Sequence, residues 1–158
     1  MDTSFEIAPF LADRRSGILD RAEAEVARRH LPHYEEVGPD EVATRLAALF
    51  DAVVASAEAR TLDPALVHAH GMADARQRAG HHLSEVQRAI NALEEQLWLT
   101  VVEDVPGDSQ AYVLGVVSTI LGAVKDRLAC DYLAGATSSR PTTLRLDELF
   151  KGTGAGPA

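Results

Sequence analysis

The six histidines are the side chains whose types and spacing first suggest chemistry. Two histidines bind one metal ion from a helix when they lie three or four residues apart, because such positions share a face. His68 and His70 are two residues apart, so they point in different directions. His81 and His82 are adjacent and diverge as well. Neither pair is spaced for a shared ion.

Two further combinations have a usable spacing but a poor placement. His30 and His33 are three apart, but Pro32 interrupts the helix that would present them. His81 and Glu85 are four apart, yet we expect His81 to precede the helix that holds Glu85. The sequence also has no His-Glu-x-x-His motif and no Glu-x-x-His repeat. It therefore predicts no metal site.

Haem binding needs only one axial histidine in a helical pocket, so His70 and His81 are candidate ligand-binding residues. The alternative is that both are partly exposed residues at helix ends, with His81 and His82 close to the carboxyl end of the preceding helix. Aromatic residues make up 5% of the chain, which leaves few rings to enclose a porphyrin. We favour this alternative and predict no cofactor, with a haem- or tetrapyrrole-binding globin-like protein as the second hypothesis.

No group is arranged for catalysis. Cys130 has no activating neighbour and is interpreted as a small structural residue. Glu94 and Glu95 are adjacent, so their carboxylates diverge, and the glycine-rich stretch at residues 152–156 precedes no helix that could bind phosphate. We predict that the protein is not an enzyme.

Composition narrows the class of protein. The 158 residues suit one domain, and the formal net charge of −9 argues against nucleic acid as a partner. The single cysteine indicates a reducing compartment. The N-terminus lacks a signal-peptide pattern, and the longest uncharged run, residues 109–124, is short for a membrane span. A cytoplasmic protein that contacts no membrane is expected.

Apolar residues recur at helical spacing almost throughout, and no two-residue strand period appears. Asp63 is expected to cap one helix, Gly80 to end it, and Ser84 with Gln87 to form a capping box for the next. Residues 30–41 are expected to be a loop. The pattern predicts an all-α fold, a single bundle of about five main helices, at about 7–26, 42–54, 63–79, 84–101 and 109–134.

The last of these helices is apolar nearly all round, which predicts burial on more than one side. Small residues form one of its faces and let another backbone approach closely. Either this face packs on a neighbouring helix of the same chain, or it is a subunit interface. The dimer-interface candidates are Gly115, Ser118, Thr119 and Gly122.

The character of the chain changes after Gly135. Residues 1–135 are predicted to form the helical domain, and residues 136–158 a flexible tail with a short amphipathic segment, residues 144–150. This segment either docks back on the domain or is presented to a partner.

One segment resembles a known family. It contains Arg78, Gly80, Leu83, Glu85 and Val86, followed by spaced apolar residues and Trp98. These residues resemble the RsbRD N-terminal domain family, the sensory regions of RsbR-type co-antagonists of the bacterial stressosome. The family outline is similar too, with a Pro-His-Tyr loop at residues 32–34 and a long final helix that ends near Tyr132. The resemblance covers roughly residues 8–135.

The resemblance implies a non-haem, globin-like sensory module of bacterial stress signalling that dimerises and passes a signal to an output region. Family members commonly continue into such a region, whereas this sequence stops at Ala158. We therefore expect a non-enzymatic sensory or regulatory module, homodimeric through its last helix, with the tail available to a separate signalling protein.

Overall fold

The structure, a computed structural model, describes the backbone of residues 5–139 and the side chains of residues 5–136. Seven helices follow one another: α1 (Ile7–Asp13), α2 (Arg15–Arg29), α3 (Pro32–Val37), α4 (Pro39–Ala59), α5 (Asp63–Arg78), α6 (Leu83–Asp104) and α7 (Gly107–Ser139). Residues 5–139 contain no strand. The predicted all-α class is confirmed.

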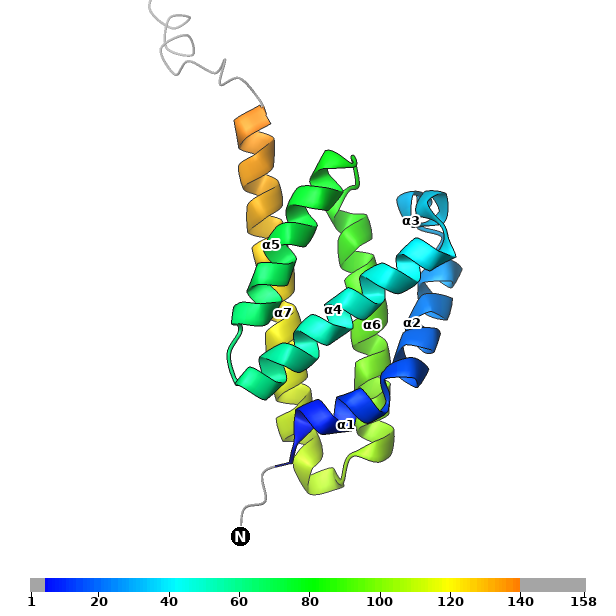
Figure 1. The fold of residues 1–158 in the computed structure, drawn as a ribbon, viewed down its shortest axis with the longest axis vertical. Coiled ribbons are helices and arrows are strands. Elements are labelled where there is room, and N and C mark those ends of the chain that lie inside the picture. The colour runs from blue at the N-terminus through cyan, green and yellow to red at the C-terminus, as the bar shows by residue number, and fades with distance from the viewer. Residues whose placement is uncertain (1–4, 140–158) are drawn as a thin grey trace, which may run out of the picture.

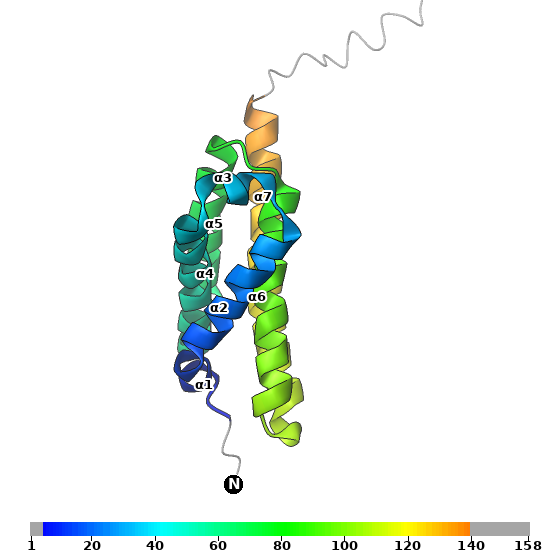
Figure 2. The ribbon, with the colours of Figure 1, turned by 90° about the vertical axis from the view of Figure 1, so that its right-hand side faces the viewer.

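The helices form two layers that enclose one core. Figure 2 shows α1, α4 and α5 on one side and α6 and α7 on the other, with α2 crossing between them. α7 packs against α5 and α6, and α2 packs against α4 and α6. In Figure 1 the carboxyl-terminal part of α7 projects past the other helices at the end where α5 and α6 are joined. The short α3 lies at this same end (Figures 1 and 2).

The expected loop at residues 30–41 is wrong, because this region holds α3 and the start of α4. Pro32 and Pro39 stand in the first turns of these helices, where the missing N–H is no loss. Gly38 separates the two helices with φ of +86°, a backbone conformation that favours glycine. The prolines therefore start helices here.

The helix-end predictions had mixed outcomes. Gly80 follows the end of α5 in the left-handed region, φ +80°, as predicted. The capping box is wrong, because α6 begins at Leu83 with His82 as its N-cap and no side-chain cap. Asp63 is the first residue of α5 rather than its cap.

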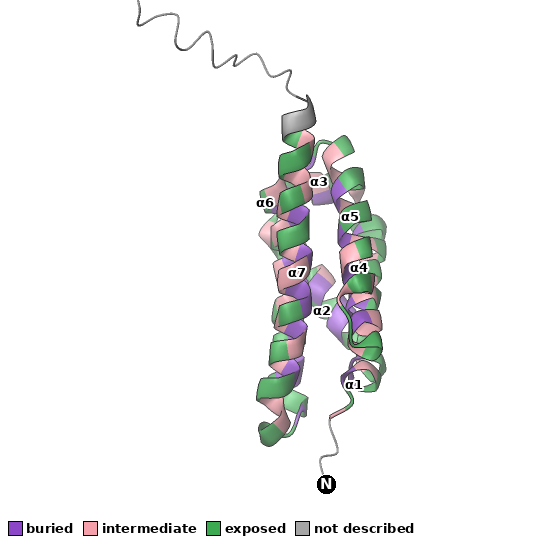
Figure 3. Ribbon diagram, turned by 90° about the vertical axis from the view of Figure 1, so that its left-hand side faces the viewer, coloured by how far each residue is buried: buried purple, intermediate pink, exposed green. Residues whose placement is uncertain are grey.

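The last helix is buried on one side only, contrary to prediction. Figure 3 shows exposed positions along the part of α7 whose burial is described, beside a buried side that faces the bundle. The buried side carries large aliphatic residues: Val113, Val117, Ile120, Leu121, Val124 and Leu128. α7 also passes the predicted domain boundary at residue 135 and continues to Ser139, while the amphipathic segment at 144–150 lies outside the described residues.

No helix within residues 5–139 is both long enough and apolar enough to cross a membrane.

Candidate functional site

A group of polar side chains converges at the end of the bundle where α3, α5 and α6 meet. We call it the polar cluster, and it comprises His33 and Tyr34 of α3, Arg45 of α4, Arg76 of α5, His81 between α5 and α6, and Glu85 of α6.

His33, His81 and Glu85 form the centre of the cluster. The Nδ1 atom of His33 contacts the Oε2 atom of Glu85. The rings of His33 and His81 lie 4.7 Å apart between centroids. One ligand atom from each of the three residues falls within 4.8 Å of the other two. Three side chains with metal-binding atoms therefore meet in one place.

Two arginines and a tyrosine lie beside this centre. Arg76 lies close enough to Tyr34 to act on it electrostatically, and the guanidinium of Arg45 lies 5.7 Å from the centroid of the Tyr34 ring. Arg45 Nε also pairs with Glu41 at 2.9 Å. Burial, followed by the nearby charge of Arg45, lowers the pKa of Arg76. The cluster thus holds two cations close enough to repel each other.

Several nitrogens in and beside the cluster are buried without a hydrogen-bond partner. In the part of the chain whose side chains are described, four such atoms occur: Arg45 Nη1, His68 Nε2, Arg76 Nε and His81 Nδ1. Arg76 acts electrostatically on both histidines, which places the four nitrogens in one region. Buried polar groups are normally paired, so this concentration of unmet donors and lone pairs calls for an explanation.

Burial also has the largest effect on the pKa of the His81 imidazole. Its side chain is 5% exposed, and burial, then the charge of Arg45, lowers the pKa of its imidazole. At neutral pH this favours the neutral ring, which keeps one nitrogen free to accept a hydrogen bond or bind a metal ion.

The cluster is connected to α7 through the backbone of His81. The Tyr132 hydroxyl donates a hydrogen bond of 3.1 Å to the His81 carbonyl oxygen. Gln77 Nε2 of α5 donates in turn to the Tyr132 carbonyl at 3.1 Å. Burial raises the pKa of Tyr132 to about 12, so its hydroxyl stays a donor at neutral pH. These bonds lie where α7 begins to project from the bundle (Figure 1).

The two histidines predicted as ligand-binding candidates lie in different environments. His70 is exposed on α5, and its Nδ1 pairs with Asp131 of α7 at 2.9 Å. His81 was expected to be a partly exposed helix-end residue; this is wrong, because it packs against His33 and Tyr34. His81 lies between α5 and α6, and it is buried because α3 packs against this connection.

Neither histidine lines either of two clefts on the described part of the chain. A cleft of about 780 Å³ lies between α1, the α4–α5 connection and the start of α7. A smaller one of about 270 Å³ lies between α2 and the start of α4. Haem binding at His70 or His81 stays the second hypothesis, which an absorption spectrum after reconstitution would test.

The small-residue face of α7 points away from the core. Gly115 and Thr119 are exposed, and Ser118 and Gly122 are half-buried. Among the described residues, a Cβ atom added at Gly115 or Gly122 would meet nothing within 4 Å. Neither glycine is therefore packed against another described helix, although Gly115 borders the larger cleft. The subunit interface stays a prediction.

Sequence reasoning missed His33, Arg45 and Arg76 as site residues. Arg45 and Arg76 had no distinguishing signal, because arginine at helical spacing is ordinary on a solvated face. His33 was set aside because Pro32 was expected to prevent a helix there. The available signal was the combination of a proline at a helix start with a histidine directly after it.

Comparisons of the chain with family models, curated proteins and solved structures gave no match.

Proposed function

We propose that this protein is a non-enzymatic sensory or regulatory module, globin-like in its helical packing, that acts as a homodimer. A ligand or a change of charge at the polar cluster is the input. The output is a shift in the carboxyl-terminal part of α7, which a separate signalling protein reads together with the tail. The resemblance to RsbRD N-terminal domains agrees with this proposal.

One observation carries the proposal. A buried cluster with unpartnered nitrogens is hydrogen-bonded, through the His81 carbonyl and Tyr132, to the helix that projects from the bundle. Unmet buried groups are destabilising, and an incoming ligand that pairs with them favours one arrangement of the surrounding backbone. The α5–α6 connection is the natural part to move, since His81 lies outside both helices.

The proposed dimer places the exposed side of α7 against its copy. Gly115 and Gly122 allow close approach of a second backbone there, since no described atom lies within 4 Å of the position that a Cβ atom would take. On the neighbouring α6, Trp98 and Val102 are also largely exposed. Together they provide apolar area for an isologous interface.

Gly122→Leu tests the dimer. The new side chain has room in the monomer, so the fold is expected to persist while the dimer dissociates in size-exclusion chromatography with light scattering. Asp126→Leu, one turn further along on an exposed position, is the control for a general effect of leucine on α7. A wild-type monomer would refute the homodimer.

Hydrogen exchange tests the connection between the cluster and α7. Glu85→Gln alters the cluster without touching α7, and we expect it to change amide exchange in residues 128–136. Tyr132→Phe removes the hydrogen bond to His81, so the same Glu85→Gln change should have little effect on α7 in that background. Unchanged exchange in α7 for Glu85→Gln would contradict the proposed function.

A further inference from the structure

We propose that His33, His81 and Glu85 bind a divalent transition-metal ion, with zinc as the representative case. This inference rests on the proposed function, because it names the ligand of the same polar cluster. It also departs from the sequence analysis, which predicted no metal site from spacing along single helices.

The donor set suits such an ion. Two imidazole nitrogens and one carboxylate oxygen bind zinc in sites that keep a fourth position for water or another ligand. The same set also holds non-haem iron(II). The exposed His82 also lies nearby, its ring 5.8 Å from that of His33 between centroids.

Binding a metal ion would require little rearrangement of the three residues. Their ligand atoms lie within 4.8 Å of one another, whereas ligand atoms around a tetrahedral zinc ion lie about 3.4 Å apart. His33 is on a helix of only six residues and His81 lies between helices, so both can shift without disturbing a long helix. Glu85, held in the long α6, supplies the fixed ligand.

The second, independent observation is the condition of His81. The residue is 5% exposed, yet its Nδ1 atom has no hydrogen-bond partner among the described residues. This atom belongs to a ring that packs on His33, the residue already in contact with Glu85. A metal ion between the three side chains would give the buried imidazole of His81 the partner that it lacks.

The neighbouring charges make the proposal testable. Arg45 and Arg76 oppose a cation, while Glu85 and Glu41, the partner of Arg45, attract one. An anion would instead pair with the unmet nitrogens of the two arginines. Replacing Arg45 therefore has opposite effects on the two kinds of ligand: it strengthens the binding of a cation and weakens the binding of an anion.

The experiment uses the full chain, freed of metal with a chelator. Cobalt(II) is titrated and followed by its visible absorption, and zinc is then added to displace it. We expect one ion per chain. His81→Gln, His33→Gln and Glu85→Gln should each weaken binding by more than about 100-fold, because removing even a residue that only orients a ligand costs 10–100-fold. Circular dichroism checks that each variant is folded, and Glu85→Gln is nearly isosteric.

His70→Gln is the matched control, since His70 also pairs with a carboxylate but at an exposed site. Cys130→Ser removes the exposed thiol, so that cobalt absorption in this variant cannot come from a thiolate. Both variants should retain the bound ion, and Arg45→Gln should bind it more tightly. Absence of binding, or binding that survives all three ligand substitutions, would overturn the proposal.

Inorganic phosphate tests the opposing case. Binding of phosphate that Arg45→Gln abolishes, without any site for cobalt, would identify an anion site and refute the metal site.

Failure of the metal site and failure of the proposed function give different results. If α7 still responds to Glu85→Gln by hydrogen exchange but no metal binds, only the identity of the ligand is wrong. If metal binds and α7 does not respond, the sensory role fails while the metal site stands.

Discussion

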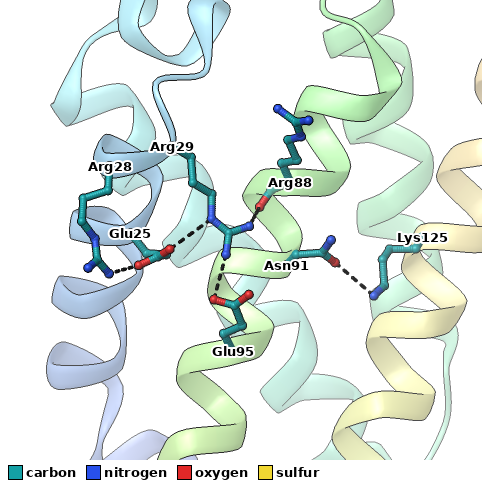
Figure 4. Close-up of polar contacts among 7 residues, drawn as sticks. All are labelled: Glu25, Arg28, Arg29, Arg88, Asn91, Glu95 and Lys125. Atoms are coloured by element: carbon teal, nitrogen blue, oxygen red, sulfur yellow. Dashed lines mark hydrogen bonds and ion pairs between the residues drawn. The ribbon is translucent and has the colours of Figure 1, made fainter.

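Two regions of the molecule hold arginines beside carboxylates, and they differ in how many of the arginine nitrogens have a hydrogen-bond partner. On the outer side of α2 and α6, Arg29 uses all three of its side-chain nitrogens (Figure 4): Nε and Nη2 pair with Glu25 and Glu95, and Nη1 donates to the Arg88 carbonyl. In the polar cluster, Arg45 and Arg76 each keep a buried nitrogen without a partner.

The difference separates a structural from a functional use of the same side chains. In the Arg29 network each side-chain nitrogen of the arginine has a partner, and nothing further is needed to explain it. A cluster with unmet buried donors is destabilised by several incomplete hydrogen bonds, and proteins tend to retain such arrangements where a ligand completes them. The free energies of unfolding of variants, measured in metal-free protein, can test this distinction.

Glu85→Gln and Glu95→Gln are a matched pair with the largest expected difference. The Glu85 side chain is 11% exposed and Glu95 is 54% exposed. Loss of the Glu85 charge removes the carboxylate partner of His33 and should lower the free energy of unfolding by about 2 kcal/mol. Loss of the Glu95 charge should cost less than about 0.5 kcal/mol, because water replaces the pair. Urea denaturation measures both, and equal costs would remove the distinction between the two regions.

Tyr34→Phe tests whether the hydroxyl of Tyr34 supports the cluster. Tyr34 is buried, and Arg76 interacts with it electrostatically. Removing the hydroxyl takes away a polar neighbour of a half-buried cation, so the free energy of unfolding should fall by about 1 kcal/mol. Tyr112→Phe on the exposed part of α7 is the control and should change stability by less than about 0.5 kcal/mol. Similar values for both variants would show that Arg76 finds water instead.

The pH dependence of stability should report His68. Burial, then the charge of Arg76, lowers the pKa of His68 below its ordinary value of 6.5. The unfolded chain therefore protonates His68 more readily than the folded chain does. The stability that is present above pH 6.5 is lost as the pH falls from 6.5 through the lowered pKa of the folded protein. His68→Gln should flatten that part of the profile in urea denaturation with chelator present. An unchanged slope would show that His68 is not desolvated.

The sequence predicted the class of fold and most of the helices because apolar spacing is a local property. Gly80 was correctly placed after a helix for the same reason, since φ near +80° favours glycine regardless of the remaining chain. The candidate site, in contrast, depends on contacts between residues that are far apart in the sequence. His33 and Glu85 are 52 residues apart, and their contact depends on how α3 lies across the end of α6.

A local misreading hid that contact. Pro32 was interpreted as a helix breaker, although it starts α3, so His33 was assigned to a loop. The capping box at Ser84 failed because His82 is the N-cap of α6. His81 precedes α6 as expected, but it is buried because it packs against His33 and Tyr34 of α3, a contact that helix-end signals do not encode.

The smallest effect is expected from the completed network, and a double-mutant cycle measures it. Arg29→Gln, Glu95→Gln and the double variant should give a coupling energy of about 0.5 kcal/mol or less, because the Glu95 carboxylate is largely exposed and solvent screens the pair. That coupling should vanish in 1 M salt, where the screening length falls to about 3 Å. The stability difference between Glu85→Gln and wild type should persist in the same salt, since ions do not enter the space between His33 and Glu85. Loss of both effects in salt would place the two regions in the same class, and the unmet nitrogens of the cluster would then be ordinary hydrated groups.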